Sequence, residues 1–379
     1  MFIRKQNFNG LGRESTFFWG ARQTGKSTLL KNLYPGAYYF DLLLSSVYER
    51  FLRNTSVLRE ILSDQELSGP VIIDEIQRIP SLLNEVQWLM VNKNLQFILC
   101  GSSPGKILHS GGNLLGGRAI RSELYPLISA EIPDFELLKA LNNGLLPRHY
   151  QAANPGKLLS GYIGSYLRDE IISEARIRNI TSFSRFLEAA AFSNGEIVNY
   201  TNIAADCGVS SPTIKEYFQI LEDTMTGRFL QSYQKKPKRR VITAPKFYYF
   251  DIGVAGYLLK RGTVKYGSEA FGKAFEHLIY NEIYSYSHYS DKNYPVTYWR
   301  TASQIEVDFI MGDHEVAVEV KSTNMVNPRH LKGLKSFAEE YKVRQLIIVS
   351  TDPYQRKIDN ITVLPWKIFL EKLWAGEIV

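Results

Sequence analysis

The segment GARQTGKS, residues 20–27, satisfies the phosphate-loop pattern G-x-x-x-x-G-K-[ST] without a mismatch. In such a loop the glycines let backbone N–H groups face the nucleotide phosphates, Lys26 reaches the β- and γ-phosphates, and the Ser27 hydroxyl joins the Mg²⁺ shell. An apolar strand at 15–19 and a helical start at 27–31 supply the flanks that the loop requires. We therefore expect a site for ATP and Mg²⁺. Its predicted nucleotide contacts are the consecutive residues Gly20, Ala21, Arg22, Gln23, Thr24, Gly25, Lys26, Ser27 and Thr28.

The run VIIDE at 71–75 is a continuous apolar strand that ends in two acids, which is typical of a buried parallel strand. In phosphate-loop enzymes this is the Walker B position, where Asp74 would hold Mg²⁺ and Glu75 would polarise the attacking water. The alternative is a strand that ends in ordinary surface acids. The complete phosphate loop upstream favours the catalytic interpretation.

A third apolar strand, at 96–103, ends in small polar residues. It matches the sensor strand of AAA+ ATPases, which lies between the two Walker strands, and Ser102 is the predicted γ-phosphate sensor. Arg118 closes the string LLGGR and has two interpretations: an arginine finger or phosphate contact, or a surface arginine at the end of a helix. Both stay open, because a finger acts across a subunit boundary.

The middle of the chain predicts a helix-turn-helix unit. Apolar residues recur at helical spacing over 183–192, and 199–208 reads as a short helix that a glycine ends. A hydroxyl cap and a proline then open the next helix, which leaves Thr213 and Lys215 near the groove-reading end. The expected buried face of that helix comprises Ile214, Tyr217, Phe218 and Leu221.

Seven basic residues and no acid occur between Arg228 and Lys246. The run follows the helix-turn-helix unit and precedes a strand at 246–251, where the β-wing of a winged helix would lie. This placement favours phosphate contacts with DNA. The alternatives are a solvated loop, an ATPase lid and a protein-docking surface, and Glu216 on the presumed reading face does not favour DNA. The candidate DNA-binding residues are Thr213, Lys215, Lys235, Lys236, Lys238, Arg239 and Arg240.

The last hundred residues carry four polar side chains in the order of a PD-(D/E)xK restriction-nuclease core. Glu276 lies on an amphipathic helix, Asp308 at the end of a strand, and Glu319 and Lys321 two apart on the next strand. Residues two apart in a strand share a face. The three carboxylates would hold Mg²⁺, and the lysine would orient the attacking water. An E-x-K string also arises by chance, and whether the site cuts DNA is a separate question.

With these modules in view, the chain resembles a prokaryotic family that joins an archaeal-type AAA+ ATPase domain to a C-terminal domain of unknown function. The resemblance covers nearly the whole chain and rests on the strings GARQTGKS, IIDEIQ, ILCGSS, LLGGR with LYPL, YLRDEI, KFYYFDIG, FGKAFE, EVDF and VEVKS. It implies an ATP site and a nuclease-like position. The residues implied are Lys26, Ser27, Asp74 and Glu75 for the former and Glu276, Asp308, Glu319 and Lys321 for the latter.

The expected fold class is α/β, with a P-loop AAA+ parallel-sheet domain over 1–132 and a helical lid or linker over 133–182. A winged helix-turn-helix over 183–255 and an α/β restriction-nuclease-like domain over 256–379 would follow. We expect an ATPase that loads onto, moves along or processes DNA, including forked or branched DNA, and that forms a homo-oligomer such as a hexameric ring. The alternative is an ATP-gated signalling switch whose winged helix binds a protein and whose last domain is an inactive scaffold.

Composition and cysteine content indicate the cellular compartment. Of the 379 residues 45% are hydrophobic and 22% are charged, as in ordinary globular proteins. The start lacks the apolar run of a signal peptide, and no stretch approaches the length of a membrane span. Two cysteines far apart, Cys100 and Cys207, indicate a reducing compartment rather than a disulfide framework. We therefore expect a cytoplasmic protein without a membrane partner.

Overall fold

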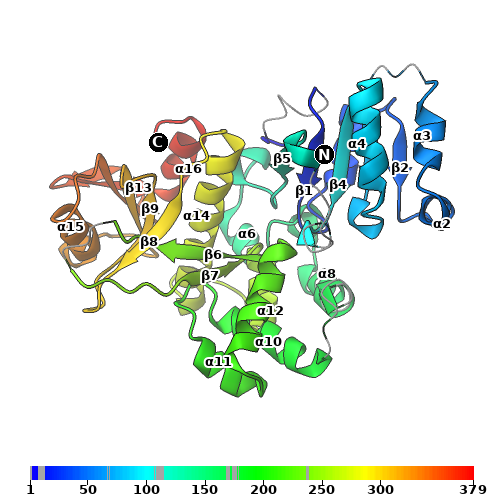
Figure 1. Cartoon of the computed structure of the whole chain (residues 1–379). Coiled ribbons are helices and arrows are strands. Elements are labelled where there is room, and N and C mark those ends of the chain that lie inside the picture. Colours follow the sequence, from blue (N-terminus) through cyan, green and yellow to red (C-terminus); the bar gives the residue numbers. More distant parts are fainter. Residues whose placement is uncertain are drawn as a thin grey trace.

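The computed structural model describes residues 2–6, 13–65, 67, 69–105, 107, 115–167, 171–172, 177, 179–235 and 239–379. Lys236 and Lys238 of the basic run lie outside these ranges. The chain forms one β-sheet with its helices at the N-terminal side, a second sheet at the C-terminal side, and helices between and below the two (Figure 1). No helix in the described ranges is both long and apolar enough to cross a membrane.

The first sheet has the strand order β2-β3-β4-β1-β5, and every neighbouring pair is parallel. Strands β1, β3 and β4 are buried along their whole length, as their apolar sequences predict. The predicted place of the third strand between the two Walker strands is confirmed, because β4 pairs with both β3 and β1. The strands are β1 (Thr16–Trp19), β2 (Tyr39–Asp41), β3 (Val71–Asp74), β4 (Phe97–Gly101) and β5 (Ile120–Glu123).

Helices cover this sheet and complete the first module. The helix α1 follows the phosphate loop directly, which gives the strand–loop–helix unit that the sequence predicts. A short 3-10 helix, η1 (Ile76–Arg78), follows β3. The remaining bounds are α1 (Lys26–Leu33), α2 (Ser45–Arg53), α3 (Val57–Leu62), α4 (Leu82–Lys93), η2 (Leu115–Gly117) and η3 (Ser129–Glu131).

A helical region follows, and both helices predicted between 199 and 221 are present. Asn199 and Ser210 cap α11 and α12 by accepting hydrogen bonds from backbone N–H groups, and Gly208 ends α11 at a φ of 67°. The expected apolar face of α12 is buried. The bounds are α6 (Leu137–Asn143), α7 (Pro147–Gln151), α8 (Pro155–Gly161), the π-helix η4 (Tyr162–Leu167), α10 (Ile180–Phe192), α11 (Tyr200–Cys207), α12 (Ser211–Asp223) and α13 (Ile252–Leu258).

The second sheet has eight strands in the order β12-β13-β11-β10-β9-β8-β6-β7. The strand β6 pairs with β7 antiparallel and with β8 parallel, so the hairpin that follows α12 continues into the C-terminal sheet. Asp308 lies inside β9 rather than at its end. The strands are β6 (Gly227–Ser232), β7 (Lys246–Tyr249), β8 (Val296–Arg300), β9 (Glu306–Met311), β10 (Val316–Lys321), β11 (Gln345–Ser350), β12 (Arg356–Ile358) and β13 (Ile361–Pro365).

Three helices pack on the C-terminal sheet: α14 (Glu269–Tyr289), α15 (Lys332–Ala338) and α16 (Trp366–Trp374). The long helix α14 is buried along much of its length and also contacts the first module, because the Tyr289 hydroxyl accepts a hydrogen bond from the Tyr125 N–H at 2.9 Å. The first module also contacts α12, since Ser103 Oγ donates to the Asp223 carbonyl at 2.9 Å. These contacts join the modules through α14 and α12.

Candidate functional site

The phosphate loop has the backbone that its sequence predicts. Gly25 has a φ of 98°, in the left-handed region that favours glycine, and Gln23 also has a positive φ of 62°. Lys26 is buried, and its ammonium group donates to the carbonyls of Gly20 at 2.5 Å and Ala21 at 3.1 Å. The loop therefore places the buried ammonium group of Lys26 at the N-terminus of α1. The helix dipole also favours an anion there, so both features suit a phosphate group.

The two Mg²⁺ ligands predicted for the phosphate loop and the Walker B strand lie together, Ser27 at the start of α1 and Asp74 at the carboxyl end of β3. Ser27 Oγ donates to Asp74 Oδ2 at 2.6 Å. Tyr39 Oη donates to the same oxygen at 2.5 Å, and burial together with Asp74 raises the pKa of that phenol, so it stays a donor. A hydroxyl and a carboxylate are oxygen ligands of the kind that Mg²⁺ takes, so the residues present fit the ion. Tyr39 could not be predicted from its sequence position, because only the pairing of β2 with β3 brings it to Asp74.

The predicted catalytic acid and the predicted sensor are connected through a third residue. Gln77, on η1, donates from Nε2 both to the Glu75 carboxylate and to Ser102 Oγ, the latter at 3.1 Å. Glu75 itself has a φ of 60° at the turn that follows β3. All three side chains are buried. Gln77 is part of the string IIDEIQ, but nothing in the residue pattern assigns it a role.

A cavity of about 650 Å³ opens beside the phosphate loop. Its volume is in the range of small-ligand sites. The cavity is lined by the loop, by α1, by the N-terminal segment and by α7. The contributions of the N-terminal segment and of α7 were not predicted, because these segments lie far from the loop along the chain. The lining residues are Phe2, Arg4, Thr24, Gly25, Thr28, Leu29, Asn32, Pro147, Arg148, Gln151, Ala152 and Leu158.

Arg4 fastens the N-terminal segment to this site. Its guanidinium donates to the Thr24 carbonyl of the phosphate loop at 2.7 Å and to the Tyr125 carbonyl at 2.5 Å. Its Nε lies 3.0 Å from the buried carboxylate of Glu131, which also accepts from the Lys5 N–H at 2.7 Å. The segment before β1 therefore forms part of the candidate nucleotide site.

The predicted arginine finger and the predicted DNA contacts of α12 are exposed or half-buried. Arg118 is exposed between η2 and β5, and its action across a subunit boundary stays a prediction. Lys215 is exposed on α12 with its ammonium 5.4 Å from the ring of Tyr200, and Thr213 is half-buried and bonded to the Ser210 hydroxyl at 2.9 Å. The predicted DNA contacts of this helix therefore have access to solvent.

The described part of the basic run turns toward the C-terminal domain. Lys235 pairs with Asp313, and the Arg239 guanidinium lies 2.5 Å from Glu339 and 3.3 Å from Glu340. Arg240 is exposed. The sequence run shows no acids because the acids that neutralise Lys235 and Arg239 come from a later part of the chain. DNA contact by these residues stays a prediction.

The structure brings the four nuclease-like residues to one place on the second sheet. Lys321 Nζ lies 2.5 Å from Glu319 Oε1, and Asp308 accepts a hydrogen bond from the Val320 N–H at 2.8 Å. Burial raises the pKa of Asp308 well above its usual range, and Glu319 and Glu276 raise it further. Glu276 accepts from Tyr248 Oη at 2.6 Å.

A second lysine enters this cluster from β7. Lys246 is buried, with Nζ 2.5 Å from Glu306 Oε1 and 3.4 Å from Glu276 Oε1. Two of the predicted metal ligands, Glu276 and Glu319, thus contact ammonium groups. Within the described ranges, no three histidine, cysteine or carboxylate side chains are grouped as a metal ion would require. Metal binding by this cluster stays a prediction.

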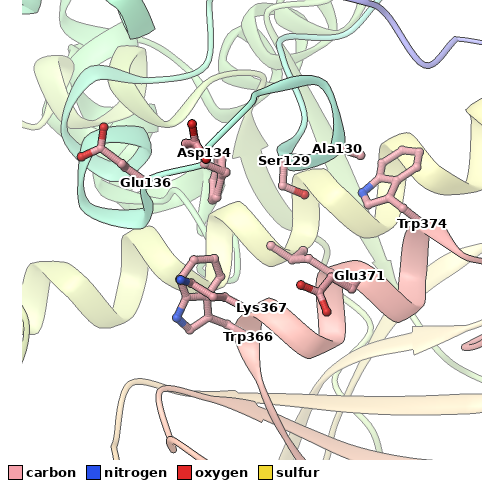
Figure 2. A pocket seen from close by; sticks show the side chains of 10 residues that line it. Ser129, Ala130, Asp134, Glu136, Trp366, Lys367, Glu371 and Trp374 are labelled. Carbon is pink, nitrogen blue, oxygen red and sulfur yellow. The ribbon is translucent and has the colours of Figure 1, made fainter.

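A second cavity, of about 520 Å³, lies between residues 129–136 and α16 (Figure 2). Two lining residues donate to the buried carboxylate of Glu282, which accepts from the Ser129 N–H at 2.7 Å, the Ser129 hydroxyl at 3.0 Å and Trp374 Nε1 at 2.7 Å. Burial raises the pKa of Glu282 to about 7. The cavity lies where the first module joins α14 and α16. Its lining comprises Ser129, Ala130, Asp134, Phe135, Glu136, Trp366, Lys367, Leu370, Glu371 and Trp374.

Comparison with known proteins assigns the first module to a class. Residues 13–132 match the family model of the AAA domain, which is the nucleotide-binding ATPase type that the parallel sheet and phosphate loop define. Residues 135–265 and 271–369 match two domains of unknown function, DUF8612 and DUF4143. The chain is also similar to the uncharacterized proteins Mb2031c of Mycobacterium bovis and Rv2008c of Mycobacterium tuberculosis. Each is 23% identical over 359 residues, which cover 91% of this chain and 78% of the relative.

Proposed function

We propose that this protein binds ATP with Mg²⁺ and hydrolyses it. The observation that carries the proposal is the 2.6 Å hydrogen bond between Ser27, at the start of α1, and Asp74, at the carboxyl end of β3, beside the buried Lys26. A hydroxyl and a carboxylate held together next to a phosphate loop form the Mg²⁺-binding pair of phosphate-loop ATPases.

Each residue of the proposed site has its own role in hydrolysis. Lys26 exchanges its carbonyl partners for phosphate oxygens, and the Ser102 hydroxyl donates a hydrogen bond to the terminal phosphate. Glu75 orients the attacking water and accepts its proton. Bound Mg²⁺ would be held by Ser27 and Asp74 and would offset the charge of the β- and γ-phosphates. The cavity lined by Arg4, Arg148 and Leu158 is placed to receive the nucleoside.

Two variants test the proposal. Lys26→Ala is expected to lose binding of a fluorescent ATP analogue, because it removes the phosphate-facing cation. Glu75→Gln is expected to bind the analogue as the wild type does and to hydrolyse ATP at least about 100-fold more slowly, since a general base contributes that much. A purified wild type that neither binds the analogue nor releases phosphate in the presence of Mg²⁺ would overturn the proposal.

We further propose DNA as the partner, contacted through the exposed side of α12 and by Arg240, with a homo-oligomer completing the ATP site through Arg118. The exposure of Lys215 and Arg240 supports this. DNA should stimulate ATP hydrolysis, and Lys215→Glu should weaken DNA binding and reduce its salt dependence. Glu216→Lys, on the same turn of α12, is the matched control and should not weaken it. Equal loss in both variants would argue against a specific α12 contact.

The second candidate is an ATP-gated switch that acts on a protein. The ion pairs of Lys235 and Arg239 within the chain favour it, as do the lysines that neutralise the nuclease-like carboxylates. An ATPase rate that no linear, forked or four-way DNA changes would support the switch. Mg²⁺-dependent cleavage of DNA that disappears in Lys321→Ala, while ATP hydrolysis survives, would support a working nuclease site instead.

A further inference from the structure

Gln77 occupies a position that the reaction described above does not yet use. Its side-chain amide nitrogen has two hydrogens, and it donates one to the Glu75 carboxylate and one to Ser102 Oγ. The residue is 2% exposed. Within the described part of the chain its Oε1 has no hydrogen-bond partner, which is an uncommon state for a buried amide oxygen. The amide is therefore held by its nitrogen end.

The backbone of β4 fixes the Gln77 side chain from the other side. A Cβ at position 101 would lie 2.2 Å from Gln77 Oε1 and 2.6 Å from the Trp19 ring, so only glycine leaves room for this packing. The opposite orientation of the amide would set its oxygen against the Glu75 carboxylate, which is repulsive. Packing and charge together hold Gln77 between the predicted general base and the predicted sensor.

We propose that Gln77 is a positioning residue that links the sensor Ser102 to the general base Glu75. This inference rests on the proposed hydrolysis of ATP. Ser102 Oγ accepts from Gln77, so its own hydrogen is free to donate to a terminal phosphate. A hydroxyl that donates becomes a stronger acceptor, because hydrogen bonds in a chain polarise one another. Binding of a nucleotide with a terminal phosphate therefore tightens the Gln77 link and fixes the Glu75 carboxylate when a substrate is present.

The test is a comparison of Gln77→Leu with the wild type in steady-state hydrolysis and nucleotide binding. Leucine is similar in size but makes neither hydrogen bond. We expect kcat to fall about 10- to 100-fold, as misplacement of a catalytic group does. We expect KM and the Kd of an ATP analogue to stay within about 3-fold, because the side-chain hydrogen bonds of Gln77 go to Glu75 and Ser102 and not to the phosphate loop. Gln87→Leu on α4 is the matched control and should leave kcat unchanged.

A double-mutant cycle separates positioning from a structural role. In the Glu75→Gln background, Gln77→Leu should cause less than about a 2-fold further loss, because groups that act as a unit are not additive. Gln77→Asn keeps the amide but shortens it, so it should also lower kcat, and it serves as the second variant if Gln77→Leu does not fold. A folded variant with unchanged kcat, or a full further loss in the Glu75→Gln background, would overturn the inference. A wild type without turnover would overturn the proposed function and this inference together, whereas an active wild type with an active variant overturns the inference alone.

Discussion

At the scale of single residues, burial decides what a charged side chain does. Lys246 belongs to the basic run in sequence, yet the structure buries it between Glu276 and Glu306, and these acids raise its pKa. Lys235 and Arg239 of the same run pair with acids that lie later in the chain. The sequence places all three in one surface patch because charge patterns do not show tertiary pairing.

Removal of the Lys246 charge is expected to destabilise the C-terminal domain. Lys246→Met removes the buried cation beside Glu276 and Glu306, whose side chains are 24% and 23% exposed. Since Glu306 keeps its pair with Arg300, the loss should be about 3 kcal/mol, the low end for removal of one partner of a buried pair. Lys273→Met is the matched control, because Lys273 pairs with Glu196 on the surface and such a pair contributes about 1 kcal/mol or less. Urea unfolding measures both changes, and equal losses would contradict the burial argument.

Glu282 predicts a dependence of stability on pH. Its folded pKa of about 7 lies above the ordinary value of 4.5, so between these values the folded state binds the proton more tightly than the unfolded chain. Its contribution is greatest below pH 4.5, falls as the pH rises to 7 and then stays level, with a total change of about 3 kcal/mol. Glu282→Gln should lack this component. Unfolding of both proteins at pH 5 and pH 8 tests it, and identical pH profiles would refute it.

At the scale of elements, local signals in the sequence were sufficient where an element is specified by its own residues. The phosphate loop, the strand at 71–74 and the capped helices α11 and α12 are confirmed because glycines, caps and apolar periodicity act within a few residues. The pairing of β6 with β8 could not be predicted. It joins Gln231 to Thr297 across more than sixty residues, and neither strand carries a signal for the other.

The N-cap of α11 provides a test at this scale. Asn199 Oδ1 accepts from the N–H groups of Thr201 and Asn202, both at 3.1 Å. Asn199→Ala should lower the free energy of unfolding by about 1 kcal/mol, because it leaves these donors without a protein partner. Asn199→Asp keeps the acceptor and should stay within about 0.5 kcal/mol of the wild type. The rate of amide hydrogen exchange in α11 should rise in Asn199→Ala but not in Asn199→Asp.

At the scale of the whole molecule, the candidate site draws on parts of the chain that the sequence does not connect. The central part of the candidate site was predictable because a single strand–loop–helix motif and the ends of two strands supply it. The contributions of Arg4, Tyr39 and the α7 residues were not, because they depend on how the N-terminal segment and the helical region pack against the loop.

Arg4 tests this long-range assembly. Arg4→Ala removes the hydrogen bonds to Thr24 and Tyr125 and leaves the buried Glu131 without its cation. ATP affinity is expected to fall about 10-fold or more, since charged hydrogen bonds contribute about 1.5–3 kcal/mol and about 1.4 kcal/mol corresponds to tenfold. Lys5→Ala, whose exposed side chain lies next along the chain, is the control. Calorimetric titration with an ATP analogue measures both, and equal affinity in the two variants would show that the segment is not part of the site.

The continuity of the second sheet has a mechanical consequence. Ser103, next to the sensor, is bonded to the carboxyl end of α12, and Glu222 on α12 accepts from the Phe229 N–H of β6. Because β6 is hydrogen-bonded to both β7 and β8, a displacement of α12 cannot move the β6–β7 hairpin without also moving β8. A displacement of α12 would therefore be passed through Glu222 to β6 and from there to β7 and β8, which couples the first module mechanically to the C-terminal sheet.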